Sequence, residues 1–271
     1  MSGPATESSA APTGIATAIG GLPYRLQLAG GWIDQPFLSA HNPEPPGSMV
    51  VVSLQPLTRY MDRCGMATGT RVVAQKLWGG TLPADRSPAS LVRELYAAEN
   101  ADRDEPSGSQ DMCGLVYRGI SRLDYDIDVD GGWFPATVTS TSDPEVVAWL
   151  ERVLHLVPVM QRPPGYGPLG IKRLDPGWIA RLSASGRACY DAIVGMDLGA
   201  LGESFNECSR AWDAILPQVF VHPTISMDLR GLLAAHAADA AGAMMSGCGG
   251  GYVIVASETP PPGSFRVVVR A

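Results

Sequence analysis

A glycine- and hydroxyl-rich turn is the first candidate for chemistry in this chain. Residues 64–71 read CGMATGTR and lead directly into an amphipathic stretch at residues 72–78. Unpaired amides at the start of a helix lie at the positive end of its dipole and suit a phosphate chain. The alternative is an ordinary helix cap, because Gly/Thr turns are common there. The candidate nucleotide-binding residues are Gly65, Met66, Ala67, Thr68, Gly69, Thr70 and Arg71.

Two carboxylates bracket a Pro-Ser-Gly turn farther along the chain. Glu99 ends a helical pattern at residues 90–99, and Asp111 precedes an apolar run at residues 113–117 that is typical of a strand. Such a pair can divide the work of phosphoryl transfer, since one acid can hold Mg²⁺ while the other takes the proton of the attacking hydroxyl. Three further acids between them are typical of a solvated loop: Asp102, Asp104 and Glu105.

A third candidate is the acid in the turn after the first strand pattern. Residues 30–34 read GGWID, so Asp34 could accept hydrogen bonds from a polyol while Gly31 lets that ligand approach the backbone. The alternative is that Asp34 caps its own turn. His41 could line the same acceptor pocket, although a histidine beside Asn42-Pro43 suits a structural turn.

A glycine run near the C-terminus is the fourth candidate. Residues 246–251 read SGCGGG and precede a strong strand pattern. Consecutive glycines clear side chains from the backbone, as is needed where a phosphate or another loop lies against it. A flexible linker is the alternative, but linkers usually have polar surroundings and these flanks do not. Gly249 and Gly250 are therefore candidate substrate-binding residues.

Composition limits what the chain binds. Its 271 residues favour two lobes or one large α/β unit. A net charge of -7 provides no broad basic face for a nucleic acid or an anionic membrane. We therefore expect neither partner, and any phosphate ligand must be held by local amides, a metal or a few arginines.

Cysteine usage and the N-terminus indicate the compartment. The five cysteines are odd in number and widely spaced, which argues against a disulfide framework or a zinc site. Residues 1–18 lack the pattern of a signal peptide and are expected to form a flexible tail. No apolar run approaches the roughly 20 residues that cross a bilayer. We expect a reduced, cytoplasmic protein.

Strand and helix patterns alternate in the first half of the chain, and long helices dominate the second. Strands are predicted at residues 24–29, 49–54, 113–117, 136–140, 252–256 and 265–269. Helices are predicted at residues 70–78, 90–99, 144–154, 177–194, 198–215 and 227–241, with Asp143 as an N-cap and Pro144 at the first helical position. A first lobe with a mixed sheet and a helix-covered second lobe follow.

The candidate segments, in this order, resemble the GHMP kinase superfamily, which is named for galactokinase, homoserine kinase, mevalonate kinase and phosphomevalonate kinase. The likeness is greatest to its sugar-kinase branch, with the heptose-phosphate and fucose kinases. Residues 29–34 match an A-G-G-x-x-D turn, residues 65–70 look like a diverged G-L-G-S-S-S/A loop, and Glu99 with residues 106–111 fits the acid pair. Residues 246–251 match the family's S/T-G-A-G-G-G-G motif before a strand, with Cys248 in the position of its alanine.

The resemblance implies a fold and a reaction. The fold would be a two-lobed α+β GHMP kinase fold, with a ribosomal-protein-S5-domain-2-like N-terminal lobe at residues 19–160 and a ferredoxin-like, helical C-terminal lobe at residues 161–271. The reaction would be transfer of a phosphoryl group from ATP to a sugar or polyol hydroxyl, in a monomer or homodimer. A non-catalytic sugar or nucleotide sensor and a mevalonate-type decarboxylase remain as alternatives on the same scaffold.

The resemblance also assigns roles to residues. Glu99 would hold Mg²⁺ with a loop hydroxyl, which we assign to Thr68, and Asp111 would be the base. Arg25 would organise the active site, and Asp34 would hold the sugar. Arg71 stands where the family usually has a small residue, so it either touches a phosphate or projects into solvent.

Overall fold

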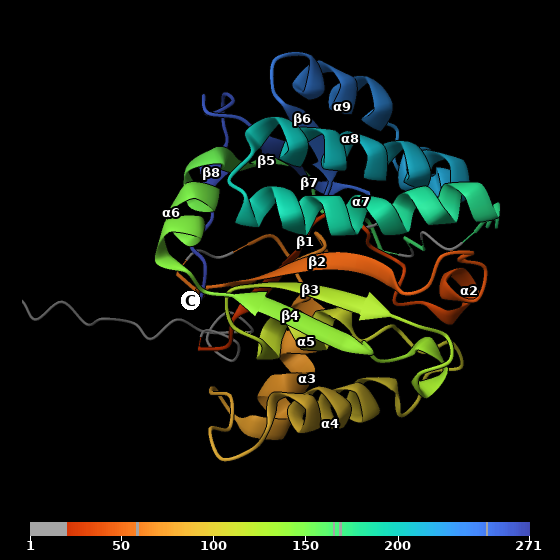
Figure 1. Cartoon of the computed structure of the whole chain (residues 1–271), viewed down its shortest axis with the longest axis vertical. Coiled ribbons are helices and arrows are strands. Elements are labelled where there is room, and N and C mark those ends of the chain that lie inside the picture. The colour runs from red at the N-terminus through yellow and green to blue at the C-terminus, as the bar shows by residue number, and fades with distance from the viewer. Residues whose placement is uncertain (1–20, 58–59, 165, 168–169, 248) are drawn as a thin grey trace, which may run out of the picture.

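The protein is an α+β structure built on two four-stranded antiparallel sheets (Figure 1). The computed structural model describes residues 21–57, 60–164, 166–167, 170–247 and 249–271. The tail expected at residues 1–18, and Cys248 in the glycine run, lie outside these residues.

The first sheet has the strand order β1-β2-β3-β4. Its strands are β1 (Tyr24–Gln27), β2 (Gly47–Leu54), β3 (Ile120–Tyr125) and β4 (Thr137–Thr141). All residues of β2 are buried, because helices cover both faces of the sheet. The run Met49-Val50-Val51-Val52 is therefore apolar on both faces instead of alternating.

Helices pack on the two faces of this sheet. One face is covered by α3 (Thr68–Trp78), α4 (Pro88–Asn100) and α5 (Gln110–Val116), the other by α7 (Pro176–Val194) (Figure 1). The short helix α2 (Pro36–Ser39) follows the turn after β1, and a 3₁₀ turn, η1 (Asp130–Gly132), packs beside it. The candidate phosphate turn and acid pair thus lie at the ends of helices on one face of the first sheet.

The second sheet has the order β6-β7-β5-β8. Its strands are β5 (Leu154–Met160), β6 (Gly242–Met245), β7 (Gly251–Ala256) and β8 (Phe265–Arg266). The helices α8 (Leu198–Ile215) and α9 (Leu229–Ala238) pack on β6 and β7, and α6 (Pro144–Val153) leads into β5. A second 3₁₀ turn, η2 (Pro217–Val219), follows α8.

The pair α7 and α8 joins the two sheets. The helix α7 packs on β2 of the first sheet, α8 packs on β6 of the second, and the two helices pack on each other. The indole of Trp212 on α8 donates a hydrogen bond to the carbonyl of Gly31, at 3.0 Å. This buried contact fixes the turn that carries Asp34 relative to the second sheet.

Aspartate N-caps explain why the helix predictions were accurate in the second half. The carboxylates of Asp143, Asp175, Asp197 and Asp228 each accept a backbone N–H of the first turn of α6, α7, α8 or α9. The predicted cap at Asp143 with Pro144 behind it is confirmed. The first N–H groups of a helix have no acceptor within it, and an aspartate just before the helix supplies one. Such a cap involves only neighbouring residues, so it can be recognised in the sequence.

The strand predicted at residues 113–117 is wrong, because residues 113–116 belong to helix α5 and Tyr117 is its C-cap. Residues Met112 to Val116 of the helix are all buried, so this part of the helix has no polar side chain on any face and its sequence is a short apolar run. Such a run does not distinguish a buried strand from a buried helix.

The first sheet is purely antiparallel instead of mixed. Three strands were not predicted: β3 of the first sheet, and β5 and β6 of the second. Strand β3 contains Arg122 and Asp124, and the Asp124 carboxylate is buried against the Ser48 hydroxyl at 2.7 Å. These polar residues hide its strand pattern. Strand β5 follows α6 with no glycine or proline between them, and β6 is only four residues long.

None of the helices in the described ranges is long and apolar enough to cross a membrane.

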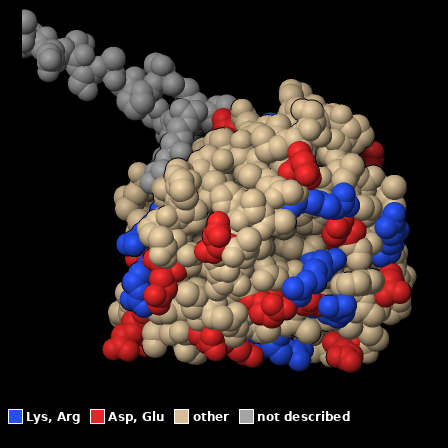
Figure 2. Space-filling model, turned by 90° about the horizontal axis from the view of Figure 1, so that it is seen from above, with Lys and Arg blue, Asp and Glu red and all other residues tan. Residues whose placement is uncertain are grey.

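The face seen from above in Figure 2 carries Lys and Arg interspersed with Asp and Glu.

Backbones meet closely where α7 crosses the first sheet. Gly30 has a φ of +86°, and a Cβ there would overlap the backbone of β2 and touch Gly186 of α7. A Cβ on Gly186 would likewise overlap the carbonyl of Ser48. Glycine at both positions therefore lets the A-G-G turn, β2 and α7 pack backbone to backbone.

We predict that Gly186→Ala lowers the free energy of unfolding by about 1–3 kcal/mol or more, because the added methyl forces α7 away from β2. Gly199→Ala is the matched control. Gly199 is at an exposed position of helix α8, where the nearest atom to its Cβ would be at 3.4 Å, so the stability of this variant should equal or exceed that of the wild type. Urea unfolding followed by circular dichroism measures both, and equal stabilities would contradict this packing.

Candidate functional site

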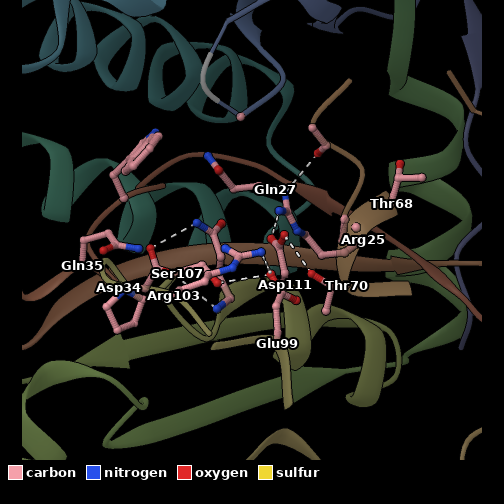
Figure 3. A pocket seen from close by; sticks show the side chains of 18 of the residues that line it. Arg25, Gln27, Asp34, Gln35, Thr68, Thr70, Glu99, Arg103, Ser107 and Asp111 are labelled. Carbon is pink, nitrogen blue, oxygen red and sulfur yellow. Dashed lines mark hydrogen bonds and ion pairs between the residues drawn. The ribbon is translucent and has the colours of Figure 1, made fainter. Parts of the chain in front are cut away.

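A cavity of about 910 Å³ brings the predicted site segments together (Figure 3). Its wall is formed by β1 and the turn after it, the turn before α3, and the connection between α4 and α5. The predicted residues that line it are Arg25, Asp34, Gly65, Met66, Ala67, Thr68, Gly69, Thr70, Glu99 and Asp111.

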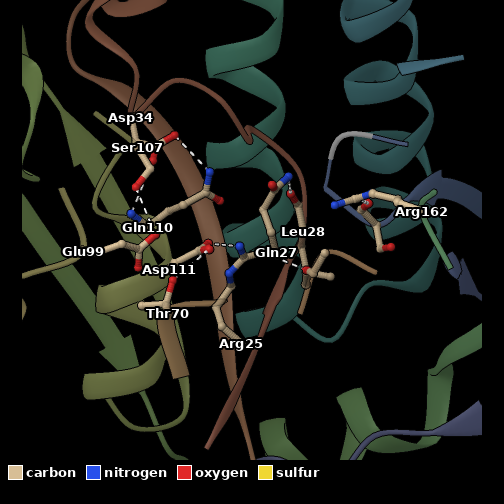
Figure 4. Close-up of polar contacts among 12 residues, drawn as sticks. Arg25, Gln27, Leu28, Asp34, Thr70, Glu99, Ser107, Gln110, Asp111 and Arg162 are labelled. Carbon is tan, nitrogen blue, oxygen red and sulfur yellow. Dashed lines mark hydrogen bonds and ion pairs between the residues drawn. The ribbon is translucent and has the colours of Figure 1, made fainter. Parts of the chain in front are cut away.

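Arg25 connects three parts of this wall (Figure 4). Its guanidinium forms an ion pair with Asp111 in the first turn of α5, and its Nη1 donates to the carbonyl of Gly65 at 3.2 Å. The arginine side chain is only 5% exposed. Gly114 makes this arrangement possible, since a Cβ there would overlap the methylenes of Arg25.

The turn before α3 offers amides to the cavity. The helix begins at Thr68, and Ala67 before it has a φ of +55° and makes no side-chain cap. Arg71 N–H bonds the Ala67 carbonyl at 3.0 Å, whereas the amides of residues 68–70 have no acceptor in the described part of the chain. The hydroxyls of the turn do not cap the helix, contrary to the ordinary-cap alternative. Amides left unpaired at a helix start can bind an anion.

The two threonines of this turn have different surroundings. Thr70 donates to Asp111 Oδ2 over a long 3.4 Å. Thr68 Oγ1 is buried and has no hydrogen-bond partner among the described residues. A buried hydroxyl without a partner costs free energy, so a ligand atom would stabilise it.

Glu99 lies at the end of α4 with its side chain 6% exposed. Its Oε1 accepts from Arg103 at 3.0 Å and from the Ser107 hydroxyl at 3.2 Å. Its Oε2 is buried without a partner among the described residues. Asn100 closes the loop that follows, because its side-chain oxygen accepts the Ser107 N–H at 2.8 Å.

Asp34 is fully buried, and its carboxylate bonds a segment that is distant in sequence. Its carboxylate accepts from the Gln110 N–H at 3.3 Å and from the Gln110 side chain at 3.1 Å. Burial raises the pKa of Asp34 to about 6, although the bonds from Gln110 and the charge of Arg25 lower it. Gly108 leaves the space for this approach, since a Cβ there would overlap the carboxylate.

Arg71 is not in the cavity wall. Its side chain is 0% exposed, lies over the ring of Tyr24 at 3.4 Å and donates to the Leu22 carbonyl at 2.7 Å. The alternative of projection into solvent is therefore wrong. The interaction with the tyrosine face fixes the arginine within the core instead of at a phosphate.

His41 and Gly31 also lie outside the cavity wall. His41 is exposed, and its ring bonds the Phe37 carbonyl at 3.1 Å, as the structural-turn alternative predicts. The space beside Gly31 is filled by the side chain of Gln27, so a ligand does not occupy it.

The glycine run packs against the phosphate turn. The Ser246 hydroxyl donates to the Cys64 carbonyl at 2.8 Å, and a Cβ on Gly251 would overlap that carbonyl. Gly249 lies against the Val219 backbone, and Gly250 against the side chain of Arg162. What lies against the backbone of Gly249 is therefore another loop. Neither Gly249 nor Gly250 lines the cavity.

Sequence reasoning missed several cavity residues. Trp32 and Phe37 flank Asp34, and their ring centroids are 6.5 Å apart. Lys172 lies over the Phe37 ring at 4.3 Å. Arg162 belongs to a Pro/Gly-rich stretch that carries no catalytic pattern. The further missed residues that line the cavity include Gln27, Gln35, Arg63, Arg103 and Trp133.

No protein-family model matches the sequence, and no curated protein matches it. Solved structures do match. A Streptococcus pneumoniae phosphomevalonate kinase in complex with phosphomevalonate and AMPPNP aligns with a TM-score of 0.57 at 10% identity, covering 88% of this chain and 91% of its own. Lactococcus lactis galactokinase complexed with galactose aligns with a TM-score of 0.55 at 12% identity, covering 88% and 84%.

A D-glycero-D-manno-heptose 1-phosphate kinase from Bacteroides thetaiotaomicron aligns with a TM-score of 0.51 at 12% identity, covering 88% of this chain and 87% of its own. At identities this low, the structural alignments show a common fold and nothing more specific. The chain therefore has the α+β fold with antiparallel sheets that these GHMP kinases share.

Proposed function

We propose that this chain is an ATP- and Mg²⁺-dependent kinase that transfers the γ-phosphoryl group to a hydroxyl of a sugar or sugar derivative. One observation carries the proposal. Four segments that are distant in sequence line the same cavity. They supply helix-start amides without acceptors, the Arg25–Asp111 pair and the buried Glu99. Phosphoryl transfer needs positioning and charge neutralisation more than covalent help, and this set can supply both.

The turn before α3 binds the phosphate chain of ATP in this proposal. Residues 68–70 line the cavity, their amides have no acceptor among the described residues, and the helix dipole favours negative charge there. Gly65 at a φ of +84° and Ala67 at +55° give the turn its shape. Backbone strain of this kind is concentrated at functional sites.

Glu99 and Thr68 fit a Mg²⁺ site. Each has a buried oxygen without a partner among the described residues. No group of three or more His, Cys, Asp or Glu in those residues could hold a metal alone. That agrees with Mg²⁺, which is usually held by one or two carboxylates together with substrate phosphates. When bound, Mg²⁺ would neutralise phosphate charge.

Asp111 is the proposed base. It would take the proton of the acceptor hydroxyl while the hydroxyl oxygen bonds to the γ-phosphorus and the bond to the ADP oxygen breaks. Arg25 fixes one carboxylate oxygen, Oδ1. The other oxygen, Oδ2, makes the long contact with Thr70, so Oδ2 is the better placed to meet an acceptor hydroxyl.

The end of the cavity around Asp34 is proposed to hold the acceptor. Trp32, Phe37 and Trp133 supply apolar surface there, against which the face of a sugar ring can pack. Asp34 supplies a carboxylate for its hydroxyl groups. A two-lobed division, the handedness of the N-terminal lobe, a monomeric or homodimeric state and a cytoplasmic location are parts of the same proposal.

We predict that Asp111→Asn lowers kcat for phosphoryl transfer by about 10²–10⁴-fold, because asparagine cannot accept the proton. Free and phosphorylated hexoses, heptoses and pentitols are first screened for ATP consumption, and phosphorus NMR then identifies a stable phosphate ester. A decarboxylase or a sensor would yield none.

Asp104→Asn is the matched control for this base assignment. Asp104 lines the same cavity but is exposed and makes no hydrogen bond in the described chain. Its variant should retain the wild-type rate. If the folded Asp111→Asn protein transfers phosphate at the wild-type rate, Asp111 is not the base.

We predict that Glu99→Gln raises the Mg²⁺ concentration for half-maximal activity by about tenfold, because a neutral amide oxygen is a weaker ligand for a hard cation. Titration of Mg²⁺ at fixed ATP measures this. Glu105→Gln, another acid of the cavity wall, should leave the titration unchanged. An unchanged Mg²⁺ requirement in Glu99→Gln would remove Glu99 from the metal site.

We predict that Asp34→Asn stabilises the fold in a pH-dependent way. The folded pKa of about 6 lies above the ordinary value of 3.8, so the folded state binds the proton more tightly and loses stability as pH rises through this window. Asparagine has no such loss. The free energy of unfolding of Asp34→Asn relative to the wild type should therefore be about 2 kcal/mol higher at pH 7.5 than at pH 4.5.

Urea unfolding at the two pH values measures this difference. The exposed Asp128→Asn serves as the control and should show no pH-dependent gain. The same Asp34→Asn protein should bind the acceptor more weakly, which appears as a raised KM. A gain that does not change with pH would mean that Asp34 is not held in a desolvated position.

A further inference from the structure

Arg162 lies between the phosphate turn and the glycine run, after the end of β5. Its Nε donates to the Gly249 carbonyl at 2.6 Å, and its Nη2 donates to the Ser246 carbonyl at 2.8 Å. Its own backbone is fixed as well, because its N–H bonds the Arg63 carbonyl at 3.2 Å. The guanidinium is therefore held in one place before any ligand binds.

Two glycines leave room for this guanidinium. A Cβ on Gly65 would lie 3.0 Å from Arg162 Nη2, and a Cβ on Gly247 would lie 3.2 Å from it. Both glycines have positive φ and both line the cavity. No side chain therefore separates the charge of Arg162 from the turn that is proposed to hold the phosphates. In Figure 4 the guanidinium points toward the side of the view where Gln27 and Arg25 lie.

The charge of Arg162 has no counter-ion in the described part of the chain. Arg25 and Arg103 in the same cavity are paired with Asp111 and Glu99. By contrast, both hydrogen bonds of Arg162 go to neutral carbonyls, which use two of its five N–H donors. A partly buried cation without a counter-ion is costly, so it is usually completed by an anion.

The phosphate turn itself brings no positive side chain to the cavity. Arg71 is the only basic residue in 64–71, and it is buried against Tyr24. Arg63, just before the turn, is exposed, and its side chain bonds the carbonyls of Arg162 and Pro163. Asp62 lines the cavity nearby but forms no ion pair with Arg162 within the described residues. Arg162 is thus the preorganised cation at the turn.

We propose that Arg162 binds the phosphate chain of the nucleotide and so contributes the charge that the turn lacks. A guanidinium fork suits phosphate oxygens, and its remaining donors make the contact directional. Since Arg162 is also bonded to the glycine run, nucleotide binding would tie that run to the phosphate turn. This inference rests on the proposed function.

Arg162→Gln tests the proposal, because it removes the charge while keeping an amide that can donate to a carbonyl. Isothermal titration measures binding of MgATP and of adenosine, which has no phosphate. We expect the Kd for MgATP to rise about tenfold or more while the affinity for adenosine stays unchanged. Arg162→Lys keeps the charge without the planar guanidinium, so its Kd for MgATP should lie between those of the wild type and Arg162→Gln.

Arg152→Gln is the matched control, since it removes an exposed arginine outside the cavity and should change neither affinity. Unchanged MgATP affinity in Arg162→Gln would overturn the phosphate role. Equal losses for MgATP and adenosine would also overturn it and would leave Arg162 as a structural link between loops. If Arg162→Gln does not fold, Arg162→Lys must show the selective loss instead. A wild-type protein that binds no MgATP would overturn the proposed function itself.

Discussion

The buried guanidinium of Arg25 is the constraint on which the site depends. A buried charge must be paired and hydrogen-bonded, and here its partners are Asp111 of α5 and the Gly65 carbonyl. These two bonds hold the first strand, the acid-bearing helix and the phosphate turn in one arrangement. Gly114 permits it by letting α5 approach the arginine stem. The electrostatics of one residue thus define the relative positions of three segments.

Close backbone approach is the second constraint, and glycines carry it. Gly108 lets the loop before α5 meet the Asp34 carboxylate, and Gly251 lets the glycine run meet the Cys64 carbonyl. Each of these glycines contacts a segment far away in sequence. These glycines are therefore positions where two distant segments touch.

The cavity contains polar groups that the protein alone does not satisfy. Glu99 Oε2 and Thr68 Oγ1 are buried without partners in the described chain, and burial holds Asp34 at a raised pKa. Such groups lower stability, so their persistence is typical of sites where a ligand completes the interactions. A fold that only needed stability would fill these positions with apolar side chains.

The sequence by itself determined the site segments and most helices, because turns rich in glycine, helix caps and periodic patterns are local signals. It indicated Arg25, Asp34, Glu99 and Asp111, which line one cavity. Only the tertiary structure decided that residues 113–116 form a helix, that Arg71 is buried on Tyr24 and that Arg162 lies at the phosphate turn. In each of these cases burial or a contact with a distant segment set the outcome, and no window of neighbouring residues contains that information.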